Sequence, residues 1–107
     1  VQISPALTKA IAYIDENYMK QLDLNSISES AGVSSQHLCR LFRQTLNCRP
    51  MEYITKRKIQ AAKILLTETQ LTIEQIAEET GFCDSSYFCK IFKRNECITP
   101  SQFRNAE

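Results

Sequence analysis

Apolar residues recur at every third or fourth position along most of the 107-residue chain, which is the spacing of the buried face of an amphipathic helix. Leu7, Ala10 and Ile14 show this spacing in the first segment. Seven segments follow the pattern, and each opens with a residue that caps or starts helices: Ser4, Asp23, Ser34, Pro50, Thr72, Asp84 and Thr99. The pattern therefore predicts an all-α fold of seven helices.

The same pattern predicts which side chains face the core. In the third helix we expect four residues on the inner side: Leu38, Leu41, Phe42 and Thr45. The fourth helix is the longest, and about 16–18 residues give it a length of about 24–27 Å. Four aromatic residues at apolar positions are expected in the core rather than as platforms for stacked bases: Tyr53, Phe82, Tyr87 and Phe103.

The second half of the chain repeats the first. The matching segments are 27–33 with 76–82, 38–43 with 88–93, and Pro50 with Pro100. Each copy consists of a short helix, a glycine turn and a second helix, which is the helix-turn-helix pattern. We therefore expect helix-turn-helix subdomains at residues 1–49 and 68–107, joined by a linking helix over residues 50–67.

The second helix of each copy has a polar face with the chemistry of a DNA reader. At 100° per residue, the side opposite the apolar stripe gathers Gln36, Cys39, Arg40 and Arg43 in one copy and Ser86, Cys89, Lys90 and Lys93 in the other. Arginine pairs with guanine, and glutamine with adenine, in the major groove. A solvated face of an ordinary helix is the alternative for either copy alone, and the repetition favours the reader.

Charge is unevenly distributed, although the formal net charge is only +1. Residues 37–66 contain seven cations and Glu52 as the single carboxylate, whereas residues 67–86 contain five carboxylates and no cation. Such segregation is what a surface for a polyanion requires. The acidic residues Glu74, Glu78 and Glu79 predict a solvated helix face, with a partner surface as the alternative.

An ordered set of motifs resembles the DNA-binding domain of the AraC/XylS-type transcription regulators over nearly the whole chain. The motifs are Gly32-x-Ser34-x-x-His37-Leu38-x-Arg40-x-Phe42, Pro50-x-x-Tyr53-Ile54, Ile59-x-x-Ala62-x-x-Leu65-Leu66, Ile76-Ala77-x-x-x-Gly81-Phe82, Tyr87-Phe88-x-Lys90-x-Phe92-Lys93 and Thr99-Pro100-Ser101-x-Phe103-Arg104. The resemblance implies two helix-turn-helix units bridged by a long helix, promoter binding, usually activation, and contact with RNA polymerase. It also implies a preceding effector or dimerisation domain, and the start at Val1 suggests a piece of a longer protein.

The resemblance assigns roles to individual residues. The base-reading positions are Gln36, Cys39, Arg40, Ser85, Ser86, Cys89 and Lys90. Phosphate contacts are expected from Ser34, His37, Arg43, Lys93 and Arg94. The family usually has glycine where Asn47 and Cys97 stand; cysteine adopts a left-handed conformation less readily, so we expect a distorted second turn. The thiols of Cys39 and Cys89 cannot pair with a base edge in bidentate fashion, so they are expected either to touch thymine methyl groups or to leave room for the backbone.

Other chemistry finds little support in the sequence. The five cysteines lack metal-ligand spacing, so reduced thiols are expected, with a redox switch as the alternative. His37 is the single histidine, and its expected role is packing or a phosphate contact. We predict no enzyme, no cofactor, no metal and no membrane segment, and a cytoplasmic location. The rival function is a helical protein-interaction domain that does not bind DNA.

Overall fold

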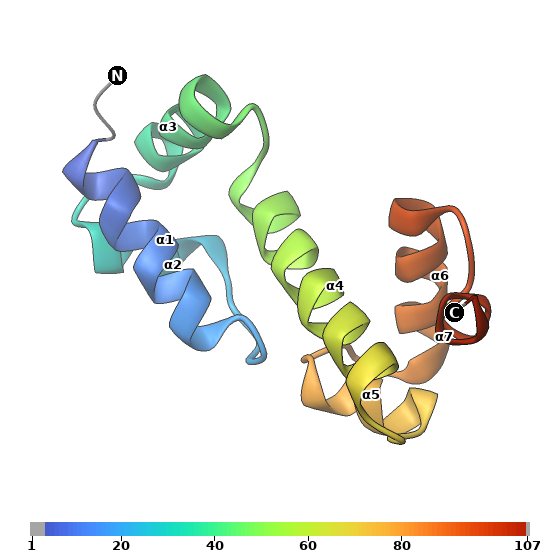
Figure 1. The fold of residues 1–107 in the computed structure, drawn as a ribbon. Helices are drawn as coiled ribbons and strands as arrows, with labels where there is room; N and C mark the ends of the chain where they lie inside the picture. Colours follow the sequence, from blue (N-terminus) through green and yellow to red (C-terminus); the bar gives the residue numbers. More distant parts are fainter. Residues whose placement is uncertain (1–3, 107) are drawn as a thin grey trace. The chain divides into compact units, whose positions relative to one another are not determined.

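The chain folds into helices and turns, and the computed structural model describes residues 4–106 (Figure 1). The helices in this range are α1 (Pro5–Asn17), α2 (Leu24–Ala31), α3 (Ser35–Leu46), α4 (Pro50–Glu68), α5 (Ile73–Glu79), α6 (Ser85–Glu96) and α7 (Pro100–Asn105). Residues 4–106 contain no strand, and none of their helices is both long and apolar enough to cross a membrane. The predicted all-α fold of seven helices is confirmed.

The chain divides into two compact units, residues 1–56 and residues 57–107, and the boundary falls inside α4. The first core consists of buried residues from α1, α2, α3 and the start of α4: Leu7, Ala10, Ile14, Ile27, Ala31, Leu38, Phe42 and Ile54. The second core consists of buried residues from the rest of α4, from α5 and α6, and from the turn between those two helices: Ile59, Ala62, Leu66, Ile76, Ala77, Phe82, Phe88, Ile91 and Phe92. Each unit therefore has its own hydrophobic core.

The same glycine turn separates the two short helices of each unit. Gly32 follows α2 with φ +74°, and Gly81 follows α5 with φ +85°. Glycine adopts this left-handed conformation without the steric penalty that a Cβ atom imposes. A Cβ built on Gly32 would meet no atom within 4 Å, so the backbone conformation rather than space favours glycine there. Both units are therefore helix-turn-helix folds built in the same way.

Capping side chains start the helices where the sequence predicted. The side-chain oxygens of six residues accept backbone N–H groups from the first turn of the helix that follows: Ser4, Asp23, Ser34, Thr72, Asp84 and Thr99. Thr72 with Gln75 forms the predicted capping box, and Thr99 with Gln102 forms a second one. The N–H of Ser26 donates to a carboxylate oxygen of Asp23 at 2.7 Å, and this hydrogen bond lowers the pKa of Asp23. These caps satisfy donors that have no partner inside the helix.

Two residues predicted to be inside are exposed. Thr45 has nearly the same helical angle as Leu38, yet it is exposed, and the next residue, Leu46, packs on the first core instead. Leu46 follows Phe42 by four residues, so the side of α3 that faces the core at this end is that of Phe42 and Leu46 rather than that of Leu38. Tyr87 is 48% exposed at the start of α6, with its ring centroid 6.1 Å from that of Phe82. It therefore lies at the edge of the second core.

Helix α7 is tied to the end of α4. The Arg104 Nε donates to the carbonyl of Leu66 at 3.0 Å, and its Nη2 donates to the carbonyl of Thr69 at 3.4 Å. The Phe103 ring packs edge-on against Phe92, at 5.6 Å between centroids. Because the last carbonyls of a helix lack partners within it, this guanidinium closes the end of α4.

The turns after α3 and α6 are built alike, contrary to the expected distortion of the second. Asn47 has φ +55° and its N–H donates to the carbonyl of Arg43 at 3.1 Å. Cys97 has φ +71° and its N–H donates to the carbonyl of Lys93 at 2.8 Å. The hydrogen bond that ends the helix holds cysteine in the left-handed region, where a Cβ atom costs about 1–2 kcal/mol.

Replacing Cys97 by glycine is expected to stabilise the second unit. Relief of the left-handed strain exceeds the backbone entropy that glycine loses on folding, so a gain of about 0.5–1 kcal/mol is expected. Asn47→Gly is the matched control and should change the free energy of unfolding less, because asparagine tolerates this conformation. Urea denaturation followed by circular dichroism measures both. Equal effects of the two substitutions would contradict the assignment of strain to Cys97.

Candidate nucleic-acid interface

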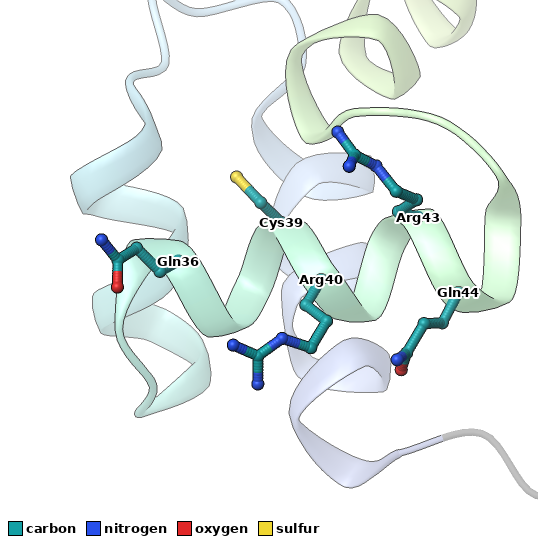
Figure 2. A pocket seen from close by; sticks show the side chains of 5 residues that line it. All are labelled: Gln36, Cys39, Arg40, Arg43 and Gln44. Carbon is teal, nitrogen blue, oxygen red and sulfur yellow. The ribbon is translucent and has the colours of Figure 1, made fainter.

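A surface groove runs along the outer face of α3 in the first unit (Figure 2). We call it the α3 groove. It has a volume of about 340 Å³ and is lined by Gln36, Cys39, Arg40, Arg43 and Gln44. Three of these residues were predicted to read bases and Arg43 to contact phosphate. The structure brings all four together on one side of the helix.

The first core fixes the orientation of the α3 groove. Leu38 and Phe42 are fully buried on the opposite side of α3, and the Phe42 ring meets Tyr53 edge-on at 5.8 Å. Ser34 starts the helix by accepting the N–H of His37 at 3.1 Å. Since burial of Leu38 and Phe42 fixes the rotation of the helix about its axis, its polar face must point to solvent.

The polar groups of the α3 groove are available for a ligand. Within residues 4–106, the side chains of Gln36, Arg40, Arg43 and Gln44 form no hydrogen bond or ion pair. All four residues are exposed. An arginine fork offers five donors in a fixed plane, and a glutamine offers a donor beside an acceptor. The groove can therefore bind both anionic groups and the edges of bases.

Gln44 is the lining residue that the sequence interpretation missed. It lies four residues after Arg40, so helix periodicity places it on the same side. Its counterpart in the internal repeat is Arg94, which was assigned to phosphate. The repeat was therefore the signal that could have found it.

Helix α6 presents a similar polar face in the second unit. Ser86, Lys90, Lys93 and Arg94 are exposed, Ser85 is partly buried, and Phe88 and Phe92 are fully buried on the other side. Cys89 is the exception, because its side chain packs partly against the second core, and burial raises the pKa of its thiol. The α6 face thus offers cations and hydroxyls, with Cys89 only partly presented.

Part of the cationic stretch 37–66 serves the fold of the second unit rather than a ligand. The Lys58 Nζ donates to the carbonyl of Gly81 at 2.8 Å, and burial lowers its pKa. The Lys63 Nζ pairs with a carboxylate oxygen of Glu96 at 3.0 Å. Some of the cations in this stretch therefore already have protein partners, because long side chains near the second core satisfy its carbonyl and carboxylate groups. Arg40 and Arg43 remain exposed.

The five cysteines are all free thiols. Cys39 lines the α3 groove, Cys83 and Cys97 are exposed, and Cys48 and Cys89 are partly buried. Burial raises the pKa of the Cys48 thiol.

Comparison with known proteins identifies the family. The family model of a helix-turn-helix domain matches residues 27–106. Among curated proteins, the chain is 36% identical over 102 residues to the HTH-type transcriptional regulator YijO of Escherichia coli, covering 94% of this chain and 36% of that protein. It is 29% identical over 103 residues to the lactose operon transcription activator of Staphylococcus xylosus, covering 96% and 37%.

Solved structures agree with this match. The C-terminal domain of AraT, a response regulator of Geobacillus stearothermophilus, has a TM-score of 0.94 and 31% identity, covering all of this chain and 89% of that one. A transcriptional regulator of Chromobacterium violaceum, described as containing an AraC-type DNA-binding domain, has a TM-score of 0.88 and 32% identity, covering 94% and 89%. The chain belongs to the AraC-type family of DNA-binding domains of transcription regulators. It spans about a third of the length of the curated relatives above.

Proposed function

We propose that this domain recognises a promoter sequence by placing α3 and α6 in successive segments of the major groove. The observation that carries the proposal is the α3 groove, where two guanidinium groups and two side-chain amides face solvent without partners in residues 4–106. Cations recur on α6 at the repeated positions of Lys90 and Lys93. Amide and guanidinium groups on one helix face suit hydrogen bonding to base edges.

Within this proposal the residues have different roles. Base edges are read by Gln36, Cys39, Arg40, Ser85, Ser86, Cys89 and Lys90, and phosphates are contacted by Ser34, His37, Arg43, Lys93 and Arg94. The base-reading role of Cys89 is the smaller one, because its side chain packs partly against the second core. Specificity then rests more on Gln36, Arg40 and Lys90, together with the sequence-dependent shape of the DNA.

The setting of the domain is also a proposal. We propose that residues 1–49 and 68–107 are subdomains joined by a linking helix over 50–67, so that one monomer reads two adjacent segments. The whole protein then activates transcription in the cytoplasm through RNA polymerase, under the control of an N-terminal effector or dimerisation domain. The name of the Staphylococcus xylosus relative as an activator supports the direction of regulation. The domain acts by binding rather than by catalysis.

The test is DNA binding over a salt series. Sequences selected from a random duplex pool are expected to bind with an affinity that falls steeply as salt rises. Each phosphate neutralised adds about −0.9 to the slope of log K against log salt, so contacts from Arg43, Lys93 and Arg94 alone give about −3. Fluorescence anisotropy with labelled duplexes measures the affinity at each salt concentration and hence this slope. Failure to select or bind any duplex would instead favour the helical protein-interaction domain.

A further inference from the structure

Gln44 occupies a position that the proposed base-reading set leaves unexplained. It lines the α3 groove together with Gln36, Cys39, Arg40 and Arg43. Figure 2 shows Gln44 and Arg40 extending from the same side of α3. The residue is exposed, and its amide has no hydrogen-bond partner in the described part of the chain. The fold of the first unit therefore does not use this side chain.

The spacing of Gln44 suits a groove-reading helix. Gln36, Arg40 and Gln44 are each four residues apart, so they follow one another by about 6 Å along the helix axis. Successive base pairs are about 3.4 Å apart along the duplex. A helix lying along the major groove would thus bring Gln44 within about two base pairs of the pair read by Arg40. Three side chains then span about 12 Å of the helix.

The chemistry of Gln44 distinguishes it from its counterpart in the second unit. An amide can donate a hydrogen bond to a phosphate oxygen, but it carries no charge that neutralises the phosphate. Its donor and acceptor together match N7 and N6 of adenine. Arg94 stands at the repeated position of α6, where its charge suits a phosphate. It is also near the end of its helix, where a cation is favoured. At this repeated position the first unit has a neutral amide and the second unit has a cation, so the two units differ in chemistry.

On the basis of the proposed function, we infer that Gln44 is a further specificity-determining residue of the first unit and selects adenine at one position of the bound sequence. The α3 groove is then read over three helical turns, with Arg40 at its centre. The corresponding position of the second unit contributes affinity without sequence preference.

Selection from a random duplex pool by the 107-residue chain and its variants tests this inference. Gln44→Ala is expected to lose the preference for adenine at one position by about 5- to 150-fold, and to keep the preferences at the others. Gln44→Glu should replace adenine by cytosine there, because a carboxylate accepts from the cytosine amino group. Thr45→Ala, exposed on α3 but outside the α3 groove, is the matched control and should leave the selected sequence unchanged.

The outcomes separate this inference from the proposed function. A Gln44→Ala protein that selects the same sequence at every position, with or without a uniform loss of affinity, would overturn the role of Gln44 alone. If the unaltered chain selects no sequence, the proposed function fails and this inference fails with it. Far-UV circular dichroism checks that both Gln44 variants remain folded, as expected for an exposed residue.

Discussion

Replacing Phe92 by alanine is expected to lower the free energy of unfolding of the second unit by about 3–5 kcal/mol. Phe92 is fully buried, and its ring centroid lies 5.7 Å from that of Phe88 and 5.6 Å from that of Phe103, edge-on in both cases. Truncation removes this apolar surface and leaves a cavity between the two remaining rings. Because a single small core supplies only a few kcal/mol of stability, the loss approaches the whole stability of the unit.

Native-state hydrogen exchange shows which helices lose stability when Phe92 is replaced. Amides of α5, α6 and α7 report the second core, so their protection should fall in the Phe92→Ala protein. Ser86→Ala is the control on the same helix, where an exposed side chain changes stability by about 0.5 kcal/mol at most. Similar protection in the two variants would show that Phe92 does not hold the second core together.

Replacing Arg40 by alanine is expected to relax sequence preference at one base pair by about 1–3 kcal/mol. A guanidinium that forms two hydrogen bonds with guanine discriminates by this amount, and alanine forms neither. Arg40 is exposed in the α3 groove and has no partner within residues 4–106, so the substitution should not disturb the fold. Anisotropy titrations against the selected duplex and its single-base variants measure the preference.

Arg43→Ala is the matched comparison, because Arg43 lines the same α3 groove. A residue that contacts phosphate should weaken binding to all sequences similarly and flatten the salt slope by about 1. Uniform loss of affinity from both substitutions would show that Arg40 does not read a base. Both residues line the α3 groove, so their position does not distinguish base reading from phosphate contact, whereas the salt slope does.

Local chemistry made most of the fold predictable. Each capping residue combines a side-chain acceptor with a following apolar period, and both signals are local, so the starts of the helices at Asp23, Ser34 and Thr72 agree with the structure. Leu38 and Phe42 were placed in the core because their spacing matches the helical repeat. Thr45 has an angle similar to that of Leu38, but near the end of α3 the core is contacted by Leu46 instead, and spacing alone does not show this change.

The surface was less predictable, since long side chains reach partners that are distant in sequence. Lys58 donates to a carbonyl 23 residues away, and no local pattern indicates which cation in a basic stretch will do so. Gln44 is less predictable for another reason, because a charge pattern indicates arginine and lysine and not a neutral amide. The turn at Cys97 shows the converse case, in which a residue with poor local preference is held by a backbone hydrogen bond.

The hydrogen bonds from Arg104 to the carbonyls of Leu66 and Thr69 have a consequence for shortened forms of this polypeptide. A stop codon placed at position 100 would delete the guanidinium that satisfies those carbonyls, and also the Phe103 ring that covers Phe92. Fraying would then start at the carboxyl end of α4 and expose apolar surface to proteases. We therefore expect that residues 100–106 stabilise the second unit and cannot be deleted without loss of stability.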